Sequence, residues 1–178
     1  YNQPALQTIL NSSGMTVPDG MAVVWLLKLK GHRHVSRVYG PDLLMATCMV
    51  GCQKGYRHYF YGGDEGVTEK LVQKVSAQCP GIKVAGIHTP PFRPLTPKED
   101  EQIVKRLNQK EVDILWVGLG SPKQEVWMQE HRHRLKAPVM VGVGAAFDFL
   151  SGNKPQAPVW MQRNGLEWLF RFVNEPKR

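Results

Sequence analysis

Apolar runs that suit buried strands alternate along this chain with amphipathic runs of helical period. The strand-like runs are HYFYGG at 58–63, Lys83 to Ile87, DILWVGLG at 113–120 and PVMVGVGAAFDFL at 138–150. Glycine-rich, proline-rich or polar stretches separate these runs from the helical segments, as in strand-to-helix connections. The alternation predicts an α/β fold, a Rossmann-like and mainly parallel sheet with helices on both faces.

Helical segments are expected where apolar residues recur every three or four positions. They are predicted at 3–13, Met21 to Lys30, 41–54, Val67 to Gln78, 97–109 and 121–135, with a short extra strand from Met15 to Val17. Pro41 suits a first helical turn, and Thr96 suits a helix cap. No internal repeat and no long linker divides the sequence, so residues 1–178 are predicted to form a single domain.

The segment from 159 to 178, VWMQRNGLEWLFRFVNEPKR, mixes tryptophan and phenylalanine with arginine and lysine. Such a mixture suits a site at a membrane–water interface. It also suits a core helix with buried aromatic residues and solvated cations, and we favour the core helix.

Basic residues outnumber acidic ones by 23 to 15, which gives a formal charge of +8. This excess attracts anionic partners, and nucleic acid, phospholipid and pyrophosphate-bearing substrates all qualify. No run approaches the roughly eighteen consecutive apolar residues of a membrane-spanning helix.

The cysteines and histidines point to ordinary structural roles. Cys48, Cys52 and Cys79 include no CxxC pair, which argues against a disulfide framework and a zinc site and fits a reducing cytosol. Cys48 and Cys52 are expected to be small buried hydrophobes. His131 and His133 are expected to mark an exposed, basic helix end.

A glycine-rich turn, Gly62-Gly63-Asp64-Glu65-Gly66, follows one predicted strand, at the edge where ligands bind in doubly wound sheets. Glycines let the backbone approach a ligand, and the next helix presents free amides to an anion. The turn matches neither a GxGxxG fingerprint nor a Walker loop, and its two acids would repel phosphate unless they point away. It is therefore either a phosphate site or a structural turn.

A second turn, GLGSPKQE at 118–125, is more specific. Gly118 and Gly120 close a strand, Ser121 can cap the helix that follows, and Pro122 suits its first turn. We expect a polar ligand above this turn; the alternative is a well-built strand-to-helix connection with solvated charges.

Six segments occur in a fixed order, VPDGMAVVW, RVYGPDLL, YGGDEGV, DILWVGLGSPKQEVWM, GVGAAFDFLSG and APVWMQRNGLEWLFRF. In this order they resemble the WecG/TagA/CpsF family, glycosyltransferase family 26, and the resemblance runs from about Leu6 onward. The family's amino-terminal segment and its carboxyl-terminal membrane-docking appendage are expected to lie outside residues 1–178. The chain is therefore expected to be the catalytic core of such an enzyme.

The resemblance implies an inverting transfer of an N-acetylmannosamine-type or related sugar from a UDP donor. The implied acceptor is the C4 hydroxyl of N-acetylglucosamine on an undecaprenyl-diphosphate lipid, in cell-surface polysaccharide synthesis such as teichoic acid linkage or exopolysaccharide. The implied location is cytoplasmic, peripheral at the inner face of the cell membrane. The resemblance also suggests a homo-oligomer.

An inverting transfer needs a general base for the acceptor hydroxyl. The resemblance assigns this role to Asp19 of the PDG motif, whose alternative role is a helix N-cap. It assigns Arg37 of the RVYG motif to a diphosphate, with an ion pair as the alternative.

Gln124 would bind a donor sugar hydroxyl or a phosphate oxygen. Asp148, at the end of the GVGAAFD strand, would face the uridine, or else cap a helix or loop. The expected donor-binding residues are Gly62, Gly63, Gly118, Gly120, Ser121, Gln124, Glu125, Gly142, Gly144 and Asp148. No DxD-type metal motif is present, so transfer without a metal is expected, and no cofactor is implied.

Other classes of function remain as alternatives. A basic nucleic-acid-binding module is motivated by GHRHVSR and EHRHRLK, but no RNP, KH or helix-turn-helix signature accompanies them, so no nucleic-acid partner is expected. A nucleotide-dependent oxidoreductase lacks its dinucleotide fingerprint. A non-catalytic scaffold of the same fold is the third alternative.

Overall fold

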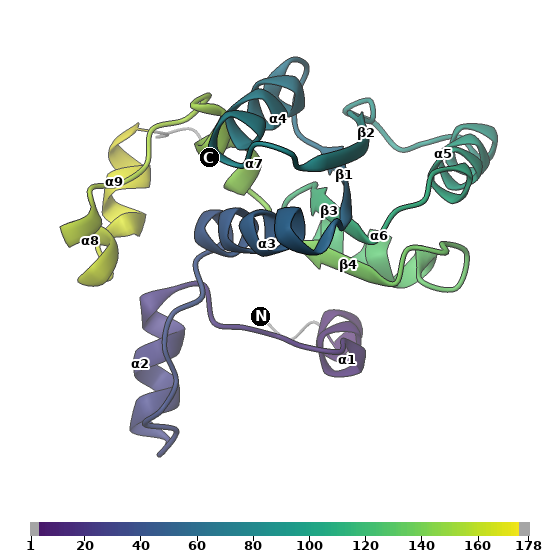
Figure 1. The fold of residues 1–178 in the computed structure, drawn as a ribbon. Coiled ribbons are helices and arrows are strands. Elements are labelled where there is room, and N and C mark those ends of the chain that lie inside the picture. Colours follow the sequence, from purple (N-terminus) through teal and green to yellow (C-terminus); the bar gives the residue numbers. More distant parts are fainter. Residues whose placement is uncertain (1–3, 175–178) are drawn as a thin grey trace.

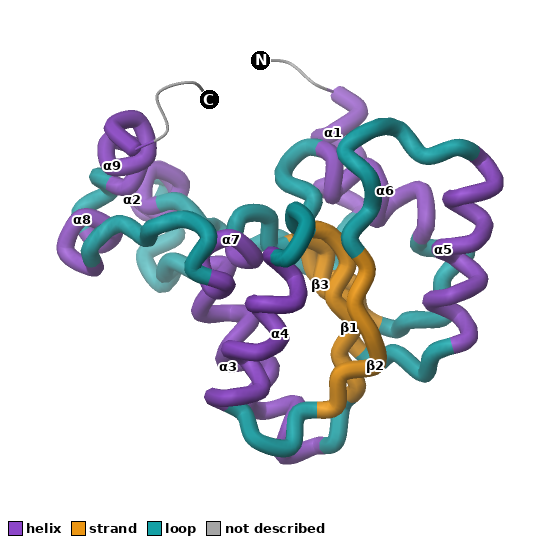
Figure 2. The backbone as a smooth tube through the Cα atoms, turned by 90° about the horizontal axis from the view of Figure 1, so that it is seen from above, coloured by secondary structure: helices purple, strands orange, loops and turns teal. Residues whose placement is uncertain are grey.

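The computed structural model describes residues 4–174 and shows a parallel sheet between two layers of helices (Figures 1 and 2). Its four strands are β1 (Arg57–Gly62), β2 (Lys83–His88), β3 (Ile114–Gly118) and β4 (Val139–Gly142), in the order β2-β1-β3-β4. Every neighbouring pair is parallel. The predicted fold class is confirmed.

Helices cover both faces of this sheet. The helices of residues 4–174 are α1 (Pro4–Ser12), α2 (Met21–Leu29), α3 (Gly40–Lys54), α4 (Val67–Gln78), α5 (Pro97–Gln109), α6 (Lys123–His131), α7 (Ala146–Ser151), α8 (Val159–Arg163) and α9 (Glu167–Asn174). Figure 2 shows α3, α4 and α7 on one face and α5 and α6 on the other. The α2, α8 and α9 helices lie beyond α7, at one end of the molecule (Figures 1 and 2).

Side chains of the central strands point alternately to the two faces of the sheet, so the core has two halves. Phe60 and Trp116 pack with residues of α3, α4 and α7, whereas Tyr59, Tyr61 and Leu115 pack with α5 and α6. All five of these side chains are at most 1% exposed. Because successive side chains point to opposite faces, a strand covered on both sides reads as a continuous apolar run. This is the pattern that the sequence shows.

A buried histidine lies within this core. His58 is 0% exposed, and its Nδ1 accepts a hydrogen bond of 3.1 Å from the indole Nε1 of Trp116. The Nε2 atom is buried without a hydrogen-bond partner among the described residues. Burial lowers the pKa of His58, so the side chain is neutral in the folded protein.

Local end signals set several helix boundaries as predicted. Thr96 caps α5 in a capping box with Glu99, because the Thr96 hydroxyl accepts from the Glu99 amide and the Glu99 carboxylate accepts from the Thr96 amide. Pro41 lies in the first turn of α3. The prediction that Ser121 caps α6 is wrong, because the N-cap residue is Pro122 and no side-chain cap bond forms.

Three predicted elements differ from the structure. No strand forms over Met15 to Val17, the helix at 121–135 extends only over Lys123–His131, and the run at 138–150 is not one strand. β4 ends at Gly142, and after a turn at Gly144, whose φ is 51°, the chain continues as α7. The first residue of the predicted helix at 3–13 lies outside the described residues.

Two burial predictions are also wrong. His131 is 3% exposed rather than solvated, because its ring stacks on Trp127 at 4.1 Å and its Nε2 lies 2.7 Å from Asp100 Oδ1. The aromatic residues of α8 and α9 do not form a core: Trp160 is 60% exposed, Trp168 66% and Phe172 67%. Cys48 is buried as expected, whereas Cys52 is half-buried.

Candidate functional site

The carboxyl ends of β1 and β3 form the point where the sheet changes direction. The connection from β1 runs through α4 on one face, and the connections through α5 and α6 run on the other (Figure 2). Ligands of open α/β sheets bind in the crevice at such a point. Gly62 lies opposite Gly118, and the Gly63 amide donates a 3.0 Å hydrogen bond to the Gly118 carbonyl.

Glycine is required at Gly62 by this close approach. Its φ is 124°, and a Cβ there would lie 2.5 Å from the Gly118 carbonyl oxygen. L-residues rarely adopt that conformation, and the backbone of β3 leaves no space for a side chain. Gly62, Gly63 and Gly118 therefore hold the two strand ends together through close backbone contact.

Gln124 joins the loops that follow β3 and β4. Its side chain is buried, its Oε1 accepts from the Gly144 amide at 2.9 Å, and its Nε2 donates to Glu125 Oε1 at 3.0 Å. A Cβ at Gly142 would lie 3.0 Å from Gln124 Nε2, so a glycine fits best there. Four predicted residues, Gln124, Glu125, Gly142 and Gly144, thus come together. Gly120 and Ser121 lie in the loop just before α6.

Asp19 lies beside the turn between β4 and α7. Its Oδ1 accepts a 3.3 Å hydrogen bond from the Gly40 amide, and a Cβ at Gly40 would lie 3.2 Å from the Val143 carbonyl oxygen. Gly20, not Asp19, is the N-cap residue of α2, so the helix-cap alternative for Asp19 is not what the structure shows. The Asp19 side chain is 61% exposed and thus open to a ligand.

The surroundings of Asp19 oppose its ionisation. The protein atoms around Asp19 replace part of its hydration, and this desolvation raises the pKa of the carboxyl the most although the side chain stays accessible; the Glu167 charge raises it further. The guanidinium of Arg37, the amide of Gly40 and the charge of Arg171 act in the opposite direction. The pKa of Asp19 is raised overall, as is useful for a carboxylate that must take up a proton.

Arg37 is paired with a residue that sequence reasoning did not single out. Its Nη2 lies 2.6 Å from Glu167 Oε2, and the two side chains are 15% and 14% exposed. Its Nε donates to the Asp19 carbonyl, its Nη2 lies 3.8 Å from Asp19 Oδ1, and its Cζ lies 4.2 Å above the Tyr39 ring. Burial raises the pKa of Tyr39 to about 12. Arg37 therefore makes an ion pair, the role given above as its alternative, and lies beside Asp19, while its assignment to a diphosphate stays a prediction.

Asp148 does not end a strand, because it lies in the first turn of α7. Its Oδ1 accepts from Asn153 Nδ2 at 3.1 Å, and its Oδ2 lies 3.8 Å from Lys154 Nζ. These contacts tie the carboxylate to the turn that follows α7, which resembles the loop-cap alternative. Among residues 4–174, the side-chain contacts of Asp148 go to this turn rather than to Asp19 or Gln124.

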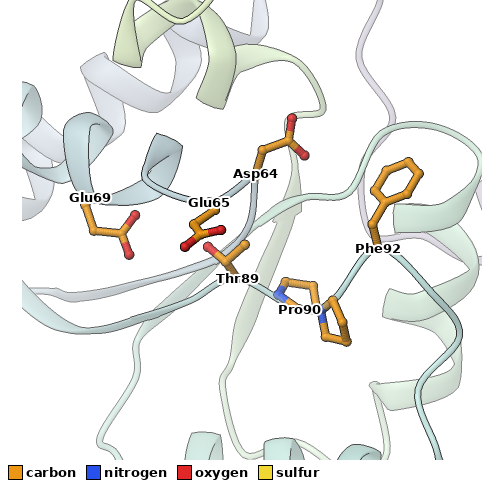
Figure 3. A pocket seen from close by; sticks show the side chains of 8 residues that line it. Asp64, Glu65, Glu69, Thr89, Pro90 and Phe92 are labelled. Atoms are coloured by element: carbon orange, nitrogen blue, oxygen red, sulfur yellow. The ribbon is translucent and has the colours of Figure 1, made fainter.

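A hollow of about 380 Å³ opens beside Gly63, between the loops that follow β1 and β2. Figure 3 shows Glu65 and Glu69 on the side of Thr89, Asp64 pointing away from it, and Phe92 standing opposite. Phe92 is 94% exposed, and Lys123 Nζ lies 4.9 Å from the centre of its ring. Prolines 90 and 91 complete an apolar wall. Sequence reasoning missed Phe92, because a phenylalanine in a proline-rich loop follows neither a helical nor a strand period that would mark it.

Two further observations concern the described part of the chain. Among residues 4–174, no three His, Cys, Asp or Glu side chains lie close enough together to hold a metal ion. Within the same range, the helices all fall short of the length and apolar character that crossing a bilayer would require.

These features define an α/β protein whose polar groups gather at the carboxyl edge of a parallel sheet. The chain belongs to the WecG/TagA/CpsF family of glycosyl transferases, whose family model matches residues 1–178. It is 34% identical over 170 residues to the N-acetylglucosaminyldiphosphoundecaprenol N-acetyl-beta-D-mannosaminyltransferase of Bacillus subtilis strain 168, covering 96% of this chain and 64% of that protein. The protein of the same name from Bacillus spizizenii is 33% identical over 175 residues, covering 98% of this chain and 66% of that protein. The chain thus spans just under two thirds of the length of these relatives.

Proposed function

We propose that this chain is the core of an inverting glycosyltransferase. It would transfer N-acetylmannosamine, or a related sugar, from a UDP donor to N-acetylglucosamine on undecaprenyl diphosphate. The observation that carries the proposal is the exposed Asp19 carboxylate, which lies beside Arg37 at the carboxyl edge of the sheet. Family membership and the activity named for the two Bacillus relatives support the choice of reaction.

Asp19 would act as the general base. As the acceptor hydroxyl oxygen forms its bond to the anomeric carbon, the carboxylate takes the hydroxyl proton, and the bond from that carbon to the UDP oxygen breaks on the opposite face. The raised pKa of Asp19 favours this proton uptake. UDP then departs with the electron pair of the broken bond, so its negative charge increases.

That increasing charge has to be stabilised at the leaving diphosphate. Arg37 and the free amides at the starts of α4 and α6 would supply the stabilisation, because helix N-termini bind phosphate. The proposal includes no metal ion. Gln124 would act mainly by fixing the turn around Gly144, since its Oε1 is already bonded there.

The hollow beside Gly63 would take a neutral, hydroxyl-bearing part of a substrate. The carboxylates of Glu65 and Glu69 line it and would repel phosphate, whereas carboxylate oxygens accept hydrogen bonds from ribose or sugar hydroxyls. The exposed ring of Phe92 would pack against the ligand. This assignment places the diphosphate nearer to the glycine pair Gly62 and Gly118.

We also propose that the chain is peripheral at the inner face of the cell membrane. The α2, α8 and α9 helices carry exposed apolar residues with basic residues nearby in sequence. The proposed membrane surface consists of Trp25, Leu26, Lys28, Leu29, Val159, Trp160, Arg163, Trp168, Phe172 and Val173. Apolar and cationic side chains together favour the surface of an anionic bilayer. Contact between copies in a homo-oligomer is a second use of the same surface.

The test combines ligand binding with turnover. Calorimetric titration with UDP, with and without EDTA, should show metal-independent binding that ADP and NADH do not reproduce. Turnover is then measured with UDP-N-acetylmannosamine and a short-chain lipid-diphosphate N-acetylglucosamine acceptor. Asp19→Asn should keep UDP binding but reduce kcat by about 10²- to 10⁴-fold, because general-base catalysis contributes about that much.

Asp42→Asn is the matched control, since Asp42 is an exposed carboxylate in the first turn of α3. It should leave both measurements unchanged. Unchanged turnover in Asp19→Asn would refute the assigned base. Absence of UDP binding to the wild-type chain would count against the donor.

A further inference from the structure

We propose that Glu167 on α9 is a positioning residue for the transfer, because it holds the guanidinium of Arg37 in place beside Asp19. The inference rests on the proposed function of Asp19 and Arg37. It gives α9 a role in the active site, although α9 is distant in sequence from both residues. Glu167 itself would not touch the reacting atoms.

The carboxylate of Glu167 is shared between two arginines. Its Oε2 accepts from Arg37 Nη2 at 2.6 Å, and its Oε1 accepts from Arg171 Nη2 at 2.6 Å. Arg171 lies one helical turn after Glu167 on α9, and its ion pair with Glu167 restricts the orientation of the Glu167 carboxylate. Because Glu167 is only 14% exposed, its charge is weakly screened and its geometry is well defined.

The contacts of Arg37 leave one edge of its guanidinium for a ligand. The Nε bonds to the Asp19 carbonyl, and Nη2 bonds to Glu167. Among the described residues these bonds use Nε and Nη2, so Nη1 remains to donate to an anion of the substrate. The ring of Tyr39 covers one face of the group. Without Glu167, Arg37 would lose its close carboxylate partner and with it a fixed orientation.

A purely structural role for Glu167 is the competing explanation, since the ion pair also ties α9 to the rest of the chain. The two explanations differ in whether Arg37 stays beside Asp19 when the Glu167 charge is removed. The charged groups that face Asp19 are Arg37, Arg171 and Glu167, with the Gly40 amide as a hydrogen-bond donor. Of the three charges, Glu167 is the one that raises the pKa of Asp19. Glu167→Gln keeps the shape of the side chain but removes that charge.

The experiment first follows the Asp19 carboxyl by NMR titration in the substrate-free chain, with Glu130→Gln as the control because Glu130 is exposed on α6. The expected result is a higher Asp19 pKa in Glu167→Gln, because the displaced Arg37 no longer lowers it, and an unchanged pKa in Glu130→Gln. A lower Asp19 pKa in Glu167→Gln would mean that Arg37 stays in place and only the Glu167 charge is lost, which would overturn the proposal. Glu167→Asp retains the charge and should restore most of the wild-type value. It also keeps the test open if Glu167→Gln folds poorly.

Turnover is then measured against pH. Because the base must be ionised, the acid limb of kcat/KM should move to higher pH in Glu167→Gln, and kcat at its plateau should fall about 10- to 100-fold from the misplaced Arg37. A lower melting temperature with an acid limb and an Asp19 titration that do not move to higher pH would overturn the proposal in favour of a structural tie. If the wild-type chain shows no transfer, the proposed function fails, while the NMR titration still decides whether Glu167 holds Arg37 beside Asp19.

Discussion

Replacing Gly62 by alanine should separate the ends of β1 and β3. Gly62 has a φ of 124°, and the added Cβ would lie 2.5 Å from the Gly118 carbonyl oxygen and 2.6 Å from its carbon. The backbone conformation costs about 1–3 kcal/mol for a residue with a side chain. Overpacking against a backbone that cannot rotate away adds about 1–3 kcal/mol. We therefore expect Gly62→Ala to lower the free energy of unfolding by about 2–6 kcal/mol.

Gly66→Ala is the matched control for this experiment. Gly66 has a φ of 75°, but nothing lies within 4 Å of the position that its Cβ would occupy. The substitution should cost only the left-handed conformation, about 1–2 kcal/mol. The comparison isolates the contact between the two strand ends.

Urea denaturation followed by circular dichroism measures both variants. The free energy of unfolding falls by about 2 kcal/mol per molar urea in a chain of this kind. Gly62→Ala should therefore lower the urea midpoint of unfolding by about 1–3 M, and Gly66→Ala by about 0.5–1 M. Equal shifts for the two variants would refute the reasoning. They would mean that the ends of β1 and β3 can move apart without cost, and that the crevice is not held by backbone contact.

Two further predictions concern the core and the proposed membrane surface. Burial lowers the pKa of His58, so the folded protein keeps this side chain neutral at pH values where the unfolded chain binds a proton. As the pH is lowered below about 6.5, the free energy of unfolding should therefore fall by up to about 1.4 kcal/mol per pH unit. The urea midpoint, measured between pH 7.5 and 5.5, should fall less in His58→Asn than in the wild type. His133→Gln, at an exposed histidine, should fall as the wild type does. An equal dependence of the midpoint on pH in all three proteins would contradict a neutral, buried His58. Phe172→Ala should weaken binding to anionic phosphatidylglycerol vesicles about 10- to 100-fold, since burying a phenylalanine contributes about 1.5–3 kcal/mol. Phe92→Ala, which removes a similarly exposed ring outside that surface, should leave vesicle affinity unchanged, and equal losses would place the membrane contact elsewhere.

Much of the candidate site could be found from the sequence, because its signals are local. Gly62, Gly118 and Gly142 follow apolar runs, and a parallel sheet brings the ends of such runs to one edge. Asp19 and Arg37 were identified through family motifs rather than through any periodicity. The structure places them next to each other, and their roles in the reaction stay a prediction.

Burial of the carboxyl-terminal helices was mispredicted from the same kind of local evidence. The amphipathic pattern of α9 is real, but amphipathicity alone does not say whether an apolar face meets the core, a membrane or another chain. His131 was mispredicted for the opposite reason. Its neighbours in sequence are basic and polar, whereas its partner Asp100 comes from α5.

The sequence by itself determined the fold class, most helices, the capping box at Thr96 and the glycine turns at the strand ends. Each of these depends on residues within a few positions of one another, so the period of apolar residues and the conformational limits of glycine and proline suffice to predict them. Tertiary structure alone decided that β4 gives way to α7, that α8 and α9 stay exposed, and that Glu167 pairs with Arg37 from 130 residues away. Such contacts depend on how whole elements pack, and no spacing along the chain encodes them.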